Sequence, residues 1–343
     1  MRLLICTQKV AANDDVLGFM HRWIEAFAAS CESVSVICLE KGEYHLPPNV
    51  SVFSLGKEHG TSRLTQVVRF VRHIIQKRDS YDAVFVHMNP EYLLLGGLFW
   101  RLAGKRAGLW YNHRMGGMRA RLGILLAEIV FFTSPFAFAS RFKKATSMPA
   151  GVDTEQFKPQ AREKIARSIL SLGRLSPVKH LEVIIGAFDE LRRRGAHFVA
   201  RIYGEPTERD RRYAQDIRRA ASPLVEEGRV RFLPGMPNSR AAAVYNEHTL
   251  FVSATPIGSF DKAVLEAMAC GVPVLSCNPS FRRLLPDELL FKEGNSGDLA
   301  DKLEILLARS RAELDALGAQ LREAVVREQS LALLVPKVLT ALS

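Results

Sequence analysis

The stretch Pro256–Ser276, PIGSFDKAVLEAMACGVPVLS, decides the fold of this chain. It predicts a loop, then a short apolar helix that ends at Gly271, and then a β-branched strand that ends at Ser276. Glu266 lies in the middle of that helix, between apolar neighbours. A carboxylate is costly to bury without a partner. We therefore expect Glu266 either to face solvent or to accept hydrogen bonds from a ligand.

Short apolar runs alternate with amphipathic stretches on both sides of this segment. Strands separated by helices of this length indicate parallel sheets with helices on both faces. The pattern occurs twice, so we predict two doubly wound, Rossmann-like α/β domains. The expected strands are Leu3–Thr7, Ser33–Leu39, Ala83–His87, Ala107–Tyr111 and Ile129–Thr133 in the first series, and Ser168–Leu172, Phe198–Tyr203, Val230–Leu233, Leu250–Ser253 and Val272–Ser276 in the second.

A polar segment, Val152–Glu163, predicts the boundary between the two domains. We expect an N-terminal domain over residues 1–155 and a C-terminal domain over residues 165–327. Ligands of open parallel sheets bind beyond the carboxyl ends of the strands, so two facing domains place the site in the cleft between them. The expected helices include Leu17–Ala29, Tyr92–Ala103, His180–Arg193 and Arg209–Ala221, with further long helices in Asp298–Ser343.

The composition is that of a globular protein. The 343 residues are 48% hydrophobic and 24% charged, and this length accommodates two domains with separate cores. The five cysteines form no C-x-x-C pair, which argues against a disulfide framework or a zinc site and favours the cytoplasm. The apolar start of the chain is too short for a signal peptide. The apolar run Leu122–Ala139 contains Glu128 and Pro135, so a helix followed by a strand fits it better than a membrane span.

Positive charge is concentrated in one part of the chain. The formal net charge is +11, and residues 61–144 carry fourteen Lys and Arg against four Asp and Glu. Such a region is either a solvated basic face or a surface for anionic lipid headgroups. We set nucleic acid aside, because no nucleic-acid-binding motif accompanies the charge. Within this region, Thr61–Lys77 predicts a basic amphipathic helix that can lie on a membrane or bury half of its apolar face in the core.

A second motif follows the strand that ends near Leu172. It reads GRLSPVKH over residues 173–180, with Gly173 at the strand end. Arg174 and Lys179 therefore lie in the same loop after this strand. A guanidinium offers paired hydrogen bonds and an ammonium offers a point charge, which together suit a diphosphate. By itself, this spacing fits a solvated turn with two incidental cations equally well.

Taken together, the two motifs resemble the donor-sugar motifs of glycosyltransferase family 4. The resemblance implies the GT-B fold, in which a C-terminal helix, here residues 328–343, returns to the N-terminal domain. It also implies roles for three residues: Arg174 and Lys179 would bind the pyrophosphate, and Glu266 would accept hydrogen bonds from the ribose hydroxyls.

The chain departs from the family at the sugar end of the site. The family's E-x7-E motif has its first glutamate eight residues before the second, where this chain has Gly258. We expect Ser259 to cap the helix, so that the backbone N–H groups of residues 259–262 point toward an anionic or hydroxyl-rich ligand. The donor-sugar loop would then comprise Gly258, Ser259, Phe260, Asp261 and Lys262.

Two histidines compete for one role in the N-terminal domain. His113 follows the strand Ala107–Tyr111 and resembles the family position where a histidine meets the transferred sugar. His87 ends the preceding strand and is its rival. Either side chain can donate a hydrogen bond to the donor or accept a proton. A lone histidine after a strand also has a purely structural interpretation.

The loop Lys9–Gly18 occupies the place where relatives carry a glycine pair near the donor phosphates. Only Gly18 is present here, preceded by Asp14 and Asp15. An acidic pair would repel a diphosphate, so we assign these two residues to the acceptor side. Asp15 has the alternative interpretation of a helix cap.

Several motifs are missing from the sequence. It has no D-x-D, which disfavours the metal-dependent GT-A type, and no cluster with metal-ligand spacing. No G-x-G-x-x-G follows the first strand, and no G-x-S-x-G occurs, so a nicotinamide dehydrogenase and an α/β-hydrolase are also disfavoured.

The resemblance therefore implies a retaining glycosyltransferase that needs neither metal nor cofactor. It would transfer a hexose-type sugar from a nucleoside-diphosphate sugar to a glycan or lipid-linked acceptor. We expect a cytoplasmic protein, peripheral on the inner face of the membrane. Two alternatives remain at this stage: a nucleotide-sugar epimerase on the same fold, and a non-catalytic nucleotide-sugar-binding protein.

Overall fold

The first series of strands forms a seven-stranded parallel sheet. The computed structural model describes residues 1–14, 17–257 and 260–343. The strand order is β3-β2-β1-β4-β5-β6-β7. Near-continuous apolar runs such as LLIC in β1 fit a central strand that is buried on both faces. The strands are β1 (Arg2–Val10), β2 (Ser33–Lys41), β3 (Val50–Ser54), β4 (Ala83–His87), β5 (Arg106–Trp110), β6 (Ile129–Phe132) and β7 (Ala145–Ser147).

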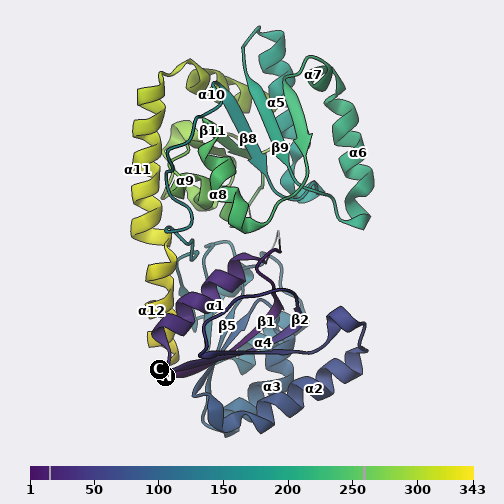
Figure 1. The fold of residues 1–343 in the computed structure, drawn as a ribbon, viewed down its shortest axis with the longest axis vertical. Helices are drawn as coiled ribbons and strands as arrows, with labels where there is room; N and C mark the ends of the chain where they lie inside the picture. The colour runs from purple at the N-terminus through teal and green to yellow at the C-terminus, as the bar shows by residue number, and fades with distance from the viewer. Residues whose placement is uncertain (15–16, 258–259) are drawn as a thin grey trace.

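Helices cover both faces of this sheet (Figure 1). One face packs against α1 and α12, and the other packs against α2, α3 and α4. Each face has its own hydrophobic core, as expected of a doubly wound domain. The helices are α1 (Phe19–Ser30), α2 (Arg63–Gln76), α3 (Glu91–Leu102), α4 (Met118–Leu126) and α12 (Leu331–Leu342).

The second series forms a five-stranded parallel sheet in the order β10-β9-β8-β11-β12. Its strands and helices share one core. The strands are β8 (Ser168–Leu172), β9 (Val199–Tyr203), β10 (Val230–Leu233), β11 (Leu250–Ser253) and β12 (Val274–Ser276). The helices are α5 (Leu181–Arg193), α6 (Arg211–Ala220), α7 (Ser222–Glu226), α8 (Asn238–Asn246), α9 (Lys262–Ala269), α10 (Ser296–Ala308) and α11 (Arg311–Gln329).

The chain crosses between the two domains twice, and the crossings lie side by side. The backbone N–H of Val152 donates to the carbonyl of Gln329 at 2.9 Å, and that of Leu331 donates to the carbonyl of Val152 at 2.7 Å. Beyond Ser330, α12 returns to the N-terminal domain, where it lies against α1 (Figure 1). The expectation of a C-terminal helix that returns to this domain is therefore confirmed.

The two parallel sheets agree with the predicted architecture, although two strands were missed. β3 and β7 are edge strands that are short and largely half-buried, so their apolar pattern is weak. The run Leu122–Ala139 contains the end of α4 and then β6, as predicted. Within the three described ranges, no helix is long and apolar enough to cross a membrane.

Candidate functional site

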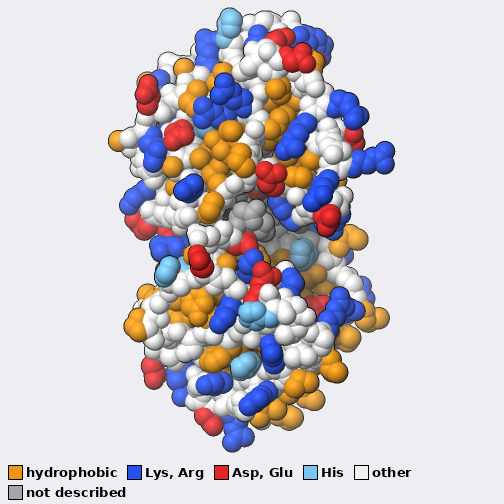
Figure 2. Space-filling model, turned by 45° about the vertical axis from the view of Figure 1, so that its right-hand side comes forward, with side chains coloured by type: hydrophobic (Ala, Val, Ile, Leu, Met, Phe, Trp, Pro, Cys, Tyr) orange, Lys and Arg blue, Asp and Glu red, His pale blue; other side chains and the backbone are white. Residues whose placement is uncertain are grey.

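A cavity of about 300 Å³ opens between the two domains. Figure 2 shows the molecule hollowed at this level. Most of the lining comes from loops at the carboxyl ends of the C-terminal sheet, and Phe19 of α1 contributes from the N-terminal domain. Among the lining residues are seven that the sequence analysis named: Gly173, Arg174, Lys179, Phe260, Asp261, Lys262 and Glu266.

The loop after β8 presents the two predicted phosphate-binding cations. Gly173 has a φ of +147°, and a Cβ there would crowd the side chain of Lys179, so glycine lets the lysine lie across the turn. Arg174 is exposed and Lys179 is half-buried. Both line the same cavity, as the predicted diphosphate site requires.

Lys179 is already paired with an anion of the protein. Its Nζ lies 2.8 Å from Oδ2 of Asp261, and the hydroxyls of Ser253 and Thr255 donate to the same oxygen at 2.8 Å each. Burial alone would raise the pKa of Asp261, but Lys179 and the two hydroxyls hold it below its usual value. Asp261 is therefore a buried counter-ion that holds Lys179 at the cavity wall.

The helix α9 begins later than the sequence suggested. Its N-cap is Asp261, whose side chain accepts from the backbone N–H of Ala263, and its first residue is Lys262. The expected cap, Ser259, lies outside the described residues, as does Gly258. Asp261 is also a good N-cap type, so residue preference alone could not choose between the two positions.

Glu266 is buried and has protein partners. Nδ2 of Asn238 donates to Oε1 at 3.2 Å, and the hydroxyl of Tyr245 donates to Oε2 at 3.1 Å. Burial raises the pKa of Glu266 to about 7. Both partners come from α8 and were missed from the sequence. Their spacing of seven residues, two helical turns, was the available signal that they share a face.

Lys262 joins the two domains. Its Nζ lies 3.4 Å from the ring centroid of Phe19 and 4.3 Å from that of Trp23, both in α1. Within the described part of the chain, this buried nitrogen has no hydrogen-bond acceptor. Burial lowers the pKa of Lys262, an effect that the nearby Glu266 carboxylate opposes. The ammonium is instead attracted to the faces of the two aromatic rings by cation–π interactions.

The two candidate histidines lie in different environments. His87 is buried at the end of β4, with its ring edge-on to Phe19 and Trp23 at 5.8 Å each. Burial, reinforced by the charges of Lys262 and His113, lowers the pKa of His87 to about 3. His113 lies exposed on the loop after β5. Neither belongs to the described residues that line the cavity.

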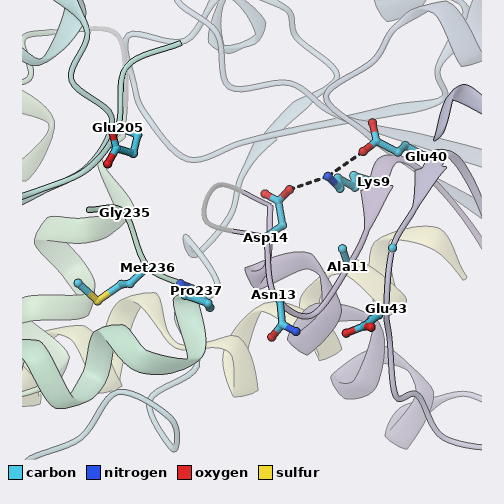
Figure 3. Close-up of a pocket in the computed structure, with 11 residues that line it drawn as sticks. Lys9, Ala11, Asn13, Asp14, Glu40, Glu43, Glu205, Gly235, Met236 and Pro237 are labelled. Carbon is cyan, nitrogen blue, oxygen red and sulfur yellow. Dashed lines mark ion pairs between the residues drawn. The ribbon is translucent and has the colours of Figure 1, made fainter. Parts of the chain in front are cut away.

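A second pocket, of about 450 Å³, lies beside the cavity (Figure 3). Glu205, Gly235 and Met236 line both hollows, so the two are continuous. Lys9 pairs with Asp14 at 3.0 Å and with Glu40 at 2.7 Å. The structure thus places Asp14 in the cleft, whereas Asp15 lies outside the described residues. The carboxylate-bearing residues of this pocket are Asp14, Glu40, Glu43 and Glu205.

Comparisons with known proteins agree with this geometry. Residues 166–309 match the family model described as glycosyl transferases group 1. The C-terminal domain is therefore similar to group 1 glycosyltransferases. The matched region contains the predicted donor residues Arg174, Lys179 and Glu266.

Two curated glycosyltransferases are similar to this chain over part of their length. A GDP-mannose-dependent alpha-(1-6)-phosphatidylinositol monomannoside mannosyltransferase of Mycolicibacterium smegmatis is 28% identical over 202 residues, which cover 52% of this chain and 50% of that protein. A D-inositol 3-phosphate glycosyltransferase of Nocardia farcinica is 30% identical over 187 residues, which cover 50% and 41%. The chain thus spans about half the length of the curated relatives it matches.

Solved structures show the same fold over the whole chain. HepE of Anabaena, in complex with UDP and glucose, superposes with a TM-score of 0.78 at 16% identity and covers 100% of this chain and 99% of that one. Sucrose-phosphate synthase of Thermosynechococcus elongatus has a TM-score of 0.77 at 17% identity, with coverage of 99% and 98%. The predicted GT-B fold is confirmed.

Proposed function

We propose that this protein is a retaining, metal-independent glycosyltransferase. It moves a hexose-type sugar from a nucleoside-diphosphate sugar to a hydroxyl group of a glycan or lipid-linked acceptor. The observation that carries the proposal is the single cavity that gathers Arg174, Lys179 and Glu266 between the two domains. Two relatives support it: one is named as GDP-mannose-dependent, and one was solved with UDP and glucose.

In this proposal, the diphosphate of the donor lies between the loop after β8 and the start of α9. Arg174 and Lys179 neutralise its charge, and the N-terminal N–H groups of α9 point toward it. When the bond to the sugar breaks, a phosphate oxygen becomes more negative and takes the proton of the acceptor hydroxyl. The new glycosidic bond forms on the face that the leaving group vacates, so the configuration is retained.

Glu266 binds the ribose of the donor. An ionised carboxylate offers about four lone-pair sites. Asn238 and Tyr245 use one site on each oxygen, so one on each remains for a ribose hydroxyl. The partners also fix the orientation of the carboxylate before the nucleotide arrives, which lowers the entropy cost of binding.

The acceptor occupies the acidic pocket beside the donor cavity. Carboxylates such as Asp14 and Glu205 accept hydrogen bonds from sugar hydroxyls and repel a second phosphate. His113, on the loop after β5, meets the transferred sugar when the cleft closes on the donor. His87 supports that region as a buried neutral ring. The protein acts in the cytoplasm, on the inner face of the membrane.

One assay tests this reaction. The protein is incubated with a panel of nucleotide sugars, with and without membrane extract, and nucleoside diphosphate release is followed. We expect release that depends on the extract, a loss of at least about a hundredfold in Lys179→Ala, and no change in the control Lys302→Ala on α10. Donor conversion without acceptor would indicate an epimerase, and binding without turnover would indicate a non-catalytic protein. Either result rejects the proposal.

The same assay tests the independence from metal ions. We expect a chelator to leave the rate unchanged, because Arg174 and Lys179 supply the positive charge that a divalent cation would otherwise bring. If the chelated enzyme is inactive and added Mg²⁺ or Mn²⁺ restores it, this part of the proposal is wrong.

A further inference from the structure

One face of the N-terminal domain carries apolar side chains that are exposed to solvent and lie outside the hydrophobic core. Among the described residues, eleven of the sixteen large hydrophobic side chains that are exposed lie between residues 64 and 136. An exposed apolar concentration of this kind marks an interaction site. Figure 2 shows hydrophobic side chains gathered along the lower right of this domain. Six of the eleven exposed residues form two rows: Leu95, Leu98 and Leu102 on α3, and Met118, Leu122 and Leu125 on α4.

The two rows lie next to each other on the outer side of the helix layer. Each repeats at a helical spacing of three or four residues, so each forms a stripe along its helix. The helices pack closely, because Gly97 of α3 leaves room for Leu126 of α4. Leu98 is 62% exposed, Leu102 is 81% exposed and Met118 is 72% exposed. We call these two stripes and the loop 113–117 the α3–α4 face.

The charge around this face selects its partner. Residues 91–128 contain six Lys and Arg against two Glu, and the two Glu pair with Arg119 and Arg106. Apolar side chains among cations fit a surface of acyl chains beneath anionic headgroups. Two copies of the chain paired through this face would bring the same cations together, which disfavours a symmetric dimer.

The α3–α4 face extends to the carboxyl edge of the N-terminal sheet. The loop 113–117 follows the carboxyl end of β5, and the carboxyl ends of parallel strands carry the site in this kind of fold. Met115 in this loop is 81% exposed, two residues after His113. A surface that contacts Met115 and Met118 therefore lies beside the loop that the proposed reaction brings to the transferred sugar.

We propose that the α3–α4 face docks on an anionic lipid bilayer, with the cleft opening at the bilayer surface. A lipid-linked acceptor then keeps its anchor in the membrane while its sugar end enters the acidic pocket. Only the statement about the acceptor rests on the proposed function. The sequence left Thr61–Lys77 open between a membrane-surface helix and a half-buried one. Because α2 buries Phe70 and Ile74, we place the centre of the surface on α3 and α4.

Vesicle retention tests the docking. Vesicles of phosphatidylcholine alone and of phosphatidylcholine with phosphatidylglycerol are mixed with the protein at moderate salt and sedimented. We expect retention on the anionic vesicles only, reduced about tenfold or more in the double variant Leu98→Ser with Met118→Ser. The matched control, Ile305→Ser with Val326→Ser, removes two exposed apolar side chains from the other domain and should bind as the wild type does. Wild-type protein that is not retained, or equal retention of both variants, overturns the proposal.

A second test adds a tryptophan to the face, so that its readout does not depend on a variant that fails to fold. Met118→Trp places an indole on the face, and Ile305→Trp places one on α10. Brominated anionic lipids should quench the added fluorescence of the first variant and leave that of the second unchanged. If neither is quenched, or both are quenched equally, the α3–α4 face does not enter the bilayer.

The outcomes separate docking from catalysis. Vesicle retention without donor turnover rejects the proposed reaction and supports the docking. Turnover without retention rejects the docking alone. Light scattering of the double variant adds a third outcome: if it converts a dimer into a monomer and vesicles retain neither form, the face joins two copies of the chain and the docking proposal is wrong.

Discussion

At the scale of single residues, the least expected feature is the pair of Lys179 and Asp261. The lysine expected to bind the donor diphosphate is held by a buried carboxylate of the protein itself. Asp261 also accepts from Ser253 and Thr255 and caps α9, so it connects β11, the loop after it and the helix. The pair fixes the position of Lys179 without a ligand, so in the proposed reaction this residue would serve both stability and donor binding.

We predict that the double variant Lys179→Ala with Asp261→Asn separates the role of Lys179 in stability from its proposed role in sugar transfer. Lys179→Ala leaves Asp261 buried without its cation, which should lower the free energy of unfolding by about 3 kcal/mol. Adding Asp261→Asn removes the stranded charge and should restore most of that stability, while transfer stays lost. Urea denaturation and nucleoside diphosphate release measure the two effects. Recovery of both properties would mean that Lys179 serves the fold alone.

We predict that donor binding strengthens as the pH rises from about 6 to 8. Burial raises the pKa of Glu266 to about 7, and only the ionised carboxylate accepts hydrogen bonds from two ribose hydroxyls. Glu266→Gln should bind more weakly and lose this pH dependence, as calorimetry across the range would show. Among the neighbours, Asp261 stays ionised because Lys179 and two hydroxyls hold its pKa below the usual value, and Tyr245 stays neutral because burial raises its pKa well above the usual value.

Lys262 requires its own control in that experiment. Burial lowers the pKa of Lys262, so it loses charge over the same range, which would weaken the binding of an anionic donor. Lys262→Met removes this opposing effect and should make the rise with pH steeper. A profile that is flat in the wild type and unchanged in Glu266→Gln would contradict the role of this carboxylate.

At the scale of elements, α11 secures the donor helix from behind. A capping box of Ser310 and Glu313 starts this 19-residue helix. Arg322 donates to the carbonyls of Ala269 and of Phe157, the former at the end of α9. Gly318 lies against the backbone of Gly271, where α9 ends, so the two helices meet without side chains between them.

We predict that Gly318→Ala destabilises the C-terminal domain. The new methyl group would overlap the carbonyl oxygen of Gly271, and backbone cannot yield as a flexible side chain does. The expected loss is about 1–3 kcal/mol, measured by urea denaturation. The control is Gly297→Ala in α10, where an added Cβ makes only an ordinary contact and stability should stay the same or rise slightly. Equal effects of the two substitutions would contradict the close packing of α11 on α9.

At the scale of the whole molecule, contacts among the described residues hold the two domains together. The paired crossings at Val152 and Ser330 form a common hinge. The hydroxyls of Ser134 and Ser280 lie 3.0 Å apart across the cleft. Lys262 lies over the rings of α1. Phe19 and Lys262 also line the cavity between the domains, so the proposed donor would lie against the same side chains that make the domain contact.

We predict that Phe19→Ala loosens the arrangement of the domains. The substitution removes the nearer of the two rings over the Lys262 ammonium, an attraction worth about 0.5–2 kcal/mol. Solution scattering should show a larger radius of gyration without ligand, and donor affinity should fall severalfold. Phe53→Ala, in the edge strand β3, should change neither. An unchanged radius and affinity in Phe19→Ala would show that the other contacts suffice.

The sequence by itself determined the two parallel α/β domains, because the local periodicity of apolar residues records each strand and helix. It predicted Arg174, Lys179 and Glu266 as donor-site residues through motifs that resemble those of glycosyltransferase family 4, and the structure brings the three to one cavity. The sequence pattern missed β3 and β7, because short, partly exposed edge strands leave a weak pattern.

Only the tertiary structure decided what these residues contact. Lys179 and Asp261 are 82 positions apart in the chain, Tyr245 and Glu266 are 21 apart, and Lys262 meets Phe19 from the other domain. The α3–α4 face likewise depends on the packing of the two helices, which brings their exposed apolar residues together. Such contacts depend on how elements that are distant in the sequence pack against one another. The local pattern of residues within one element does not specify that packing.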